Sequence, residues 1–189
     1  MSTAITTPNL EELTGTYVLD PAHSRIGFVA RHAMVTKVRG SFREFEGRAQ
    51  LDADDPSRSR FELTIQAGSV DTGNPDRDAH LRSNDFLDPA SYPQIRFVST
   101  AVEAAGPDTY KVTGDLTIKG VTKPVTFDVV YTGTAVDPFG NVRVGLEGSA
   151  RVNRKEWGVN WNVAMEAGGL LVSEQVVLEF EVSFIRQSA

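Results

Sequence analysis

The sequence predicts an all-β protein, in which about eight or nine antiparallel strands form one sheet that closes into a barrel or folds into a sandwich. Apolar and polar residues alternate with a period of two, which is typical of strands with one buried face. Short turn sequences separate these stretches, and short connections favour antiparallel neighbours. At 189 residues and 40% hydrophobic content, the chain is long enough for one domain with a full core.

The alternation is most regular in five stretches of the chain. In the first, Phe61, Leu63 and Ile65 alternate with Glu62 and Thr64. The five stretches cover residues 61–67, 110–118, 125–131, 142–146 and 176–184. Less regular apolar runs supply the remaining predicted strands, at residues 17–20, 25–32, 42–51 and 95–102.

Residues that favour turns lie between the predicted strands. They cluster at 54–56, 106–107, 119–121 and 137–141, the last around Pro138 and Gly140. We expect a looser turn at 33–38. Residues 154–171 mix Trp, Asn and Gly, which predicts a long connection or an irregular strand.

One short helix is predicted in the middle of the chain. Asn74 is a good N-cap, Pro75 suits the first helical position, and Asp76 and Asp78 place negative charge in the first turn. The helix is expected to run to about Arg82.

The composition excludes several classes of function. The chain has no cysteine, so it has no disulfides, thiol nucleophiles or thiolate metal ligands. The formal net charge of −6 argues against nucleic-acid binding, which needs a basic surface. The charge is uneven, however, because residues 21–48 carry six basic and two acidic side chains together with His23 and His32. This stretch is either a solvated face or a rim that faces an anion.

The expected compartment follows from what the sequence lacks. No stretch approaches the ~18 uncharged apolar residues of a membrane span, so we expect a soluble protein. The first residues, MSTAITTPNLEELTG, contain neither the basic region nor the apolar region of an export signal. We therefore expect a cytoplasmic location.

The predicted inward faces of the strands are almost wholly Phe, Leu, Ile, Val and Ala, without an inward Asp, Glu or Lys. Such faces form either a solid core or a cavity that admits only an apolar guest. A guest with a dozen or more carbon atoms would contribute about 10 kcal/mol before the costs of association. Periodicity alone does not distinguish the two.

The sequence contains few candidates for catalysis. No nucleophile elbow, zinc-protease, phosphate-loop or dinucleotide-binding motif occurs. His23, His32 and His80 could form a three-histidine zinc site, or each could be a hydrogen-bonded structural residue. The spacing favours the second interpretation, and we expect no cofactor.

Four ordered segments resemble the YceI-like family of polyisoprenoid-binding proteins, over most of the chain from Tyr17 to about Val182. They are DPAHSRIGFVARHAMVTKVRGSF (20–42), VDTGNPDRDAHLRSNDFLDPASYPQIRFVST (70–100), GDLTIKGVTKPV (114–125) and NRKEWGVNWN (153–162). The resemblance implies a lipocalin-like, up-and-down antiparallel barrel of about eight strands with a short helix packed alongside. It implies one barrel domain at 15–186, after a flexible segment at 1–14, and an elongated apolar tunnel.

The resemblance also suggests residues that contact a ligand. The expected lining residues are Phe28, Phe42, Ile65, Phe97, Leu116, Phe127, Leu146, Trp161 and Phe180. His32, Met34 and Arg39 are expected to form one wall near the tunnel mouth. Arg39 would bind a phosphate or quinone oxygen there, or form a surface salt bridge to Glu44 or Asp78.

Charged residues crowd the predicted helix, at Asp76, Arg77, Asp78, His80 and Arg82. Asp78 and Arg82 are spaced to pair along one helix face. The cluster either anchors the helix to the barrel or contacts a lipid head group.

The chain departs from the pattern of many relatives at three positions, Ala33, Leu87 and Trp157. These differences are expected to alter the shape of the pocket wall.

The expected function is binding, storage or transport of an isoprenoid lipid, such as an isoprenoid quinone, or of another long-chain amphiphile, without catalysis. The alternatives are an enzyme that acts on such a lipid through His32 or His80, and an interaction module with a solid barrel. An apolar mouth would expose a patch of the kind that a membrane or a second copy covers. We therefore expect transient membrane contact and a homodimer, and no nucleic-acid partner.

Overall fold

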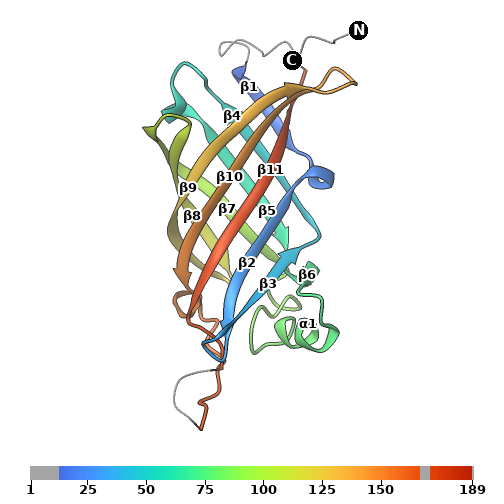
Figure 1. The fold of residues 1–189 in the computed structure, drawn as a ribbon, viewed down its shortest axis with the longest axis vertical. Helices are drawn as coiled ribbons and strands as arrows, with labels where there is room; N and C mark the ends of the chain where they lie inside the picture. The colour runs from blue at the N-terminus through green and yellow to red at the C-terminus, as the bar shows by residue number, and fades with distance from the viewer. Residues whose placement is uncertain (1–12, 167–170, 189) are drawn as a thin grey trace.

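A computed structural model describes residues 13–166 and 171–188, and these residues form eleven strands and one α-helix (Figure 1). The strands are β1 (Gly15–Leu19), β2 (Arg25–His32), β3 (Thr36–Phe42), β4 (Phe45–Leu51), β5 (Arg60–Gln66), β6 (Val70–Asp71), β7 (Gln94–Gly106), β8 (Thr109–Ile118), β9 (Val121–Val136), β10 (Val142–Asn153) and β11 (Gln175–Arg186). The helix is α1 (Pro75–Leu81). Single-turn 3₁₀ helices lie at Pro21–His23, Pro56–Arg58, Ala67–Ser69 and Arg154–Trp157.

The sheet closes on itself as a barrel. All neighbouring strands are antiparallel, and β1 pairs with both β4 and β11, which joins the two sides of the sheet. β1 and β2 lie end to end along β11 and are separated by the 3₁₀ turn Pro21–His23. In the same way, one long interrupted strand consists of β3 and β4, and another consists of β5 and β6. The result is the predicted eight-stranded barrel with one helix, and the sandwich alternative is wrong.

The helix begins as the sequence predicts. The side chain of Asn74 accepts a hydrogen bond of 3.1 Å from the backbone N–H of Arg77, and Pro75 occupies the first turn. Arg82 is the C-cap, so the predicted end is also confirmed. α1 lies at one end of the barrel, next to β6 and below β3 in the view of Figure 1.

One predicted boundary differs from the structure. The turn expected at 33–38 is shorter, because β3 already begins at Thr36. Most of the flexible segment predicted at 1–14 lies outside the described residues. Leu13 is buried, and its carbonyl accepts a hydrogen bond of 2.7 Å from the hydroxyl of Tyr17. The predicted division into a segment at 1–14 and a domain at 15–186 stays a prediction.

The alternating pattern sorts residues between the barrel interior and its outer face. On β7, for example, Ile95 and Phe97 are buried whereas Gln94 and Arg96 are exposed. Tyr17, Val70 and Trp157 are the largest fully buried side chains. In the part of the chain that the structure describes, no helix is long and apolar enough to cross a membrane.

Candidate functional site

The barrel interior contains a cavity of about 250 Å³. It extends to the α1 end, where Leu81 and Phe86 from the helix segment and Val159 from the loop after β10 border it. One water molecule needs only about 15 Å³ of such space. The inward side chains therefore surround empty space as well as contacting one another.

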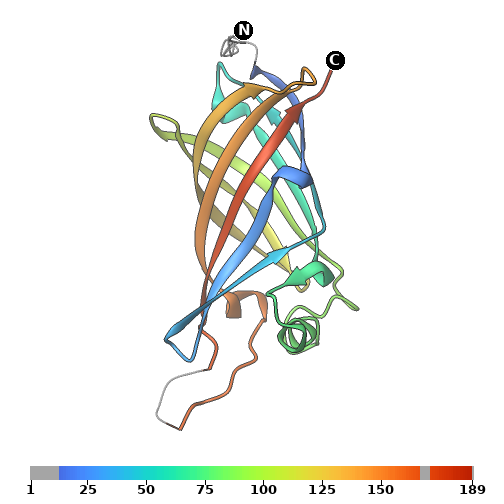
Figure 2. The same cartoon turned by 45° about the vertical axis from the view of Figure 1, so that its right-hand side comes forward.

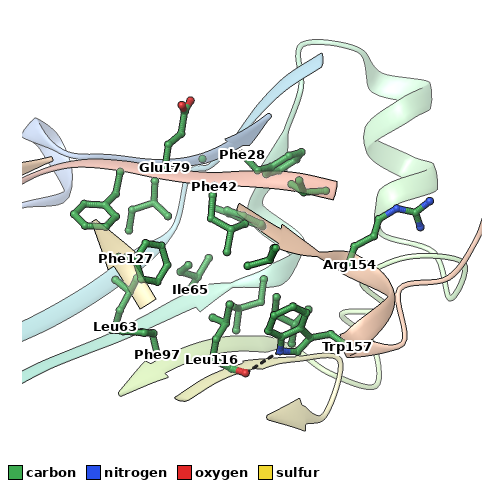
Figure 3. A pocket seen from close by; sticks show the side chains of 18 of the residues that line it. Phe28, Phe42, Leu63, Ile65, Phe97, Leu116, Phe127, Arg154, Trp157 and Glu179 are labelled. Atoms are coloured by element: carbon green, nitrogen blue, oxygen red, sulfur yellow. Dashed lines mark hydrogen bonds between the residues drawn. The ribbon is translucent and has the colours of Figure 1, made fainter. Parts of the chain in front are cut away.

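Aromatic side chains form much of the cavity wall (Figure 3). Phe127 contacts Phe97 and Phe180 in edge-to-face geometry, with ring centroids 5.3 and 5.6 Å apart. Phe28 and Phe42 form a second pair at 5.8 Å. All the residues predicted to line a tunnel border this cavity except Trp161, namely Phe28, Phe42, Ile65, Phe97, Leu116, Phe127, Leu146 and Phe180. Their contact with a ligand stays a prediction.

Two glycines let the phenylalanine rings lie flat against the wall. Gly40 on β3 is opposite Phe28, and Gly148 on β10 is opposite Phe180. A Cβ at either glycine would overlap the ring of its partner. The absence of a side chain at these positions therefore keeps both rings out of the centre of the cavity.

Trp157 closes part of the α1 end. It follows β10 in the 3₁₀ turn Arg154–Trp157, is 1% exposed, and donates a hydrogen bond from Nε1 to the carbonyl of Leu116. The departure from many relatives at Trp157 is expected to alter the pocket wall, and the side chain does border the cavity.

Arg154 is a buried cation beside the cavity that the sequence analysis missed. Its guanidinium donates to three backbone carbonyls, those of Ser173, Val159 and Val172, and lies 6.0 Å from the ring of Phe86. Burial lowers the pKa of Arg154. In Figure 3 the guanidinium points away from the cavity. Its bonds join the two ends of the connection between β10 and β11. Arg154 is the first residue of the stretch 154–171 that the sequence predicts as a long connection or an irregular strand, and that position was the available signal.

Trp161 lies outside the cavity, contrary to the prediction. The chain turns at Gly158, in a left-handed conformation, and leaves the barrel end. The indole of Trp161 then packs edge-on against His80, with centroids 4.5 Å apart, and against Phe86 at 5.4 Å. Trp161 therefore belongs to the contact between this loop and the α1 segment.

His32, Met34 and Arg39 also do not border the cavity, although a wall near its mouth was predicted. His32 ends β2, Met34 lies in the β2–β3 turn, and Arg39 lies on β3. The guanidinium of Arg39 is 3.9 Å from Glu179 and pairs with neither Glu44 nor Asp78. The cavity stays inside the barrel, whereas this hairpin continues past its end (Figure 2).

The charged cluster on α1 is tied to neighbouring backbone. The carboxylate of Asp78 accepts hydrogen bonds from the N–H and hydroxyl of Thr72. Arg82 donates to the carbonyls of Gly68 and Val70. The predicted Asp78–Arg82 pair is therefore wrong, because both side chains have partners in the segment that connects β5 and β6 to α1.

His23 and His80 contact different carboxylates. His80 is 2.8 Å from Asp85, and His23 is 2.7 Å from Asp20. His80, like His32, does not border the cavity. Among the described residues, no group of three or more His, Asp or Glu side chains converges in a way that could hold a metal ion.

A second cavity, of about 140 Å³, lies toward the end of the barrel where β1 begins. It is bordered by Leu13, Leu51 and the polar side chains of Tyr110 and Tyr131, among others. Both cavities share the residues Phe61, Val112, Val129 and Leu146. These side chains form a constriction between the two spaces, which the sequence analysis did not anticipate.

Comparisons with known proteins place this architecture among described relatives. A family model, the YceI-like domain, matches residues 17–184. The chain is 37% identical to a UPF0312 protein of Staphylococcus aureus over 169 residues, which cover 89% of this chain and 96% of the relative. It is 34% identical to a UPF0312 protein of Azotobacter vinelandii over 179 residues, covering 94% and 90% of the two chains.

Solved structures share the fold. The crystal structure of Burkholderia cenocepacia BcnA matches with a TM-score of 0.77 and 26% identity, and the match covers 87% of this chain and 98% of the other. A polyisoprenoid binding domain from Saccharophagus degradans, implicated in plant cell wall breakdown, matches with a TM-score of 0.66 and 18% identity, covering 90% and 98%.

Proposed function

This chain belongs to the YceI-like family, and we propose that it binds the hydrocarbon part of an isoprenoid or similar long-chain lipid in its barrel cavity. The protein then stores or carries that lipid without changing it chemically. The observation that carries the proposal is the apolar cavity of about 250 Å³ at the centre of the barrel.

The wall of the cavity supports a hydrocarbon ligand. Three charged residues border the cavity, Glu62, Arg154 and Glu179. The side chains of Glu179 and Arg154 point away from the space (Figure 3), and Glu62 is exposed. A hydroxyl or charged group in the cavity would lose its hydrogen bonds to water and would find no replacement among such side chains. A methylene group instead gains about 0.8 kcal/mol when it leaves water. The polar end of the ligand would therefore remain outside the apolar space.

The choice of an isoprenoid comes from the comparisons. The Saccharophagus degradans domain of the same fold is described as polyisoprenoid-binding. Branched chains of this kind are therefore the first compounds to test, and unbranched fatty acids of matched length are the second. Preference for the branched chains would support the isoprenoid class.

Two neighbouring positions on β9 provide a matched test. Val129 points inward, borders the cavity and is 4% exposed, whereas Val130 points outward and is 44% exposed. Val129→Trp would place an indole in the space that the lipid needs, and Val130→Trp adds the same group on the outer face. Titration with a fluorescent polyene fatty acid and competition with a polyprenyl alcohol would measure binding to each variant.

We expect Val129→Trp to weaken binding by about tenfold or more, since the indole replaces the contacts of several methylene groups. Val130→Trp should bind like the wild type. Equal binding by both variants, with both folded by circular dichroism, would contradict the proposal. Incubation of the lipid with the wild-type protein should leave its mass unchanged, and conversion to a product would instead favour the enzyme alternative.

A further inference from the structure

The hairpin between β2 and β3 exposes two apolar side chains at its tip, which consists of Ala33, Met34 and Val35. Met34 is 64% exposed and Val35 is 77% exposed. Ala33 and Met34 have φ angles of 52° and 62°, and the N–H of Val35 donates to the carbonyl of His32. A two-residue turn with positive φ at both positions favours Asn-Gly or Asp-Gly. This hairpin instead holds apolar residues in a conformation that costs them energy, without burying them.

The same hairpin is basic although the chain is acidic. The net charge is −6, yet residues 31–40 contain Arg31, Lys37 and Arg39 and no acidic residue. Arg31 and Lys37 face each other across the two strands. Within the described ranges, neither of them forms an ion pair with a carboxylate. The guanidinium of Arg31 donates to the carbonyl of Val35, and the backbone N–H of Arg31 donates to the hydroxyl of Ser173. Exposed apolar residues beside basic residues complement an anionic lipid surface.

The hairpin tip lies at the end of the barrel where α1 and the main cavity lie (Figure 2). The hairpin tip at the opposite end of the barrel also exposes an apolar residue, but it lies beside an acidic residue. Phe139, at the tip of the β9–β10 hairpin, is 89% exposed, but its neighbour is Asp137, whose carboxylate accepts the N–H of Phe139. Only the first of these two tips combines apolar exposure with positive charge.

We infer that the β2–β3 hairpin tip docks on anionic membranes. Met34 and Val35 enter the interfacial region of the bilayer, while Arg31 and Lys37 contact the lipid phosphates. Docking would bring the cavity end of the barrel to a lipid reservoir, and in this respect the inference builds on the proposed function. A second copy of the chain fits the tip less well, because a symmetric contact would bring the cationic side chains of the two copies together.

Co-sedimentation with lipid vesicles tests the inference. The vesicles contain either phosphatidylcholine alone or phosphatidylcholine mixed with phosphatidylglycerol, at low and high salt. The variants are the double substitution Met34→Ser with Val35→Ser, the charge reversal Lys37→Glu, and the control Phe139→Ser at the opposite end. All three sites are exposed, so each variant is expected to fold.

The wild type and Phe139→Ser should bind the anionic vesicles, and salt should weaken this binding. The double substitution and Lys37→Glu should each bind about tenfold more weakly or worse. Equal binding by the wild type and the double variant, or no preference for anionic vesicles, would overturn the inference. So would a dimer in light scattering that the double substitution dissociates, because the tip would then serve a second copy.

The fluorescent lipid titration separates this inference from the proposed function. The double variant should still bind the polyene in its cavity like the wild type, because neither Met34 nor Val35 borders the cavity. Lost vesicle binding with retained polyene binding supports docking as a separate property. Vesicle binding without polyene binding by the wild type would refute the proposed function and leave the docking surface established.

Discussion

The indole Nε1 of Trp157 donates a hydrogen bond of 2.9 Å to the backbone carbonyl of Leu116, across the α1 end of the barrel. The bond links the 3₁₀ turn after β10 to β8, and both residues border the cavity. The position of this wall therefore depends on a buried polar contact as well as on apolar packing.

Trp157→Phe should destabilise the protein by about 1–3 kcal/mol, because it removes this hydrogen bond and part of the buried ring. The cavity should also widen at this end. Urea unfolding would measure the stability, and lipid titration the binding. Trp161→Phe is the control, since Trp161 does not border the cavity. Altered lipid selectivity in the Trp161 variant but not in the Trp157 variant would contradict this assignment.

Phe61 is predicted to limit the length of the bound chain. It borders both cavities and contacts Phe184 edge-on, with centroids 6.2 Å apart. Phe61→Ala would join the two spaces at a cost of about 3 kcal/mol in stability. The variant should gain affinity for longer polyprenyl alcohols relative to shorter ones in competition titrations. The milder Phe61→Leu should give a smaller shift in the same direction, and an unchanged length preference in both variants would argue against a constriction.

Gly148 is predicted to keep the ring of Phe180 against the wall. Gly148→Ala would push that ring toward the cavity, with an overpacking cost of about 1–3 kcal/mol. Lipid binding should weaken together with stability. The neighbouring Ser149 is exposed, so Ser149→Ala serves as the control and should change neither quantity. Unchanged polyene affinity in a folded Gly148→Ala variant would show that the ring does not control access to the space.

An arginine between two carboxylates predicts a pH dependence of stability. Arg143 donates to Asp20 at 2.7 Å and to Asp137 at 2.8 Å. The hydrogen bond from Arg143 lowers the pKa of Asp20. Burial acts to raise the pKa of Asp137, but hydrogen bonds from Asn141 and Arg143 outweigh it, so that pKa is lowered as well.

Asp20 and Asp137 have lower pKa values in the folded protein than in the unfolded chain. Their contribution to the free energy of unfolding is therefore complete above about pH 4, and it is lost as the pH falls through the pKa values of the folded protein. Arg143→Met should lower the Tm near neutral pH, and its difference from the wild type should shrink in strong acid. Lys111→Met, which removes an exposed pair with Asp128, should have little effect at any pH. A Tm difference for Arg143→Met that does not change with pH would contradict this explanation.

The sequence predicted the barrel well because alternation is a local signal. Each inward residue, such as Phe97 or Phe127, is fixed by the period of two once its strand is recognised. The start of the helix could also be predicted from the sequence, because Asn74 and Pro75 act on backbone groups within one turn.

The candidate site was predicted less completely, because its ends depend on contacts between distant segments. Trp161 follows the left-handed Gly158, and no periodicity indicates where the chain goes after that turn. The partners of Arg82 and Arg154 are backbone carbonyls of other segments, which a sequence pattern does not display. The cavity itself depends on how facing side chains meet, and alternation is the same for a solid and a hollow barrel.

Mass spectrometry of the lipid extracted from natively purified protein tests the central claim most directly. We predict that an isoprenoid or another long-chain lipid co-purifies with the wild type and with Val130→Trp, and that Val129→Trp carries much less of it. A wild-type protein that yields no more lipid than Val129→Trp, in repeated preparations, would contradict the claim that this cavity holds a lipid.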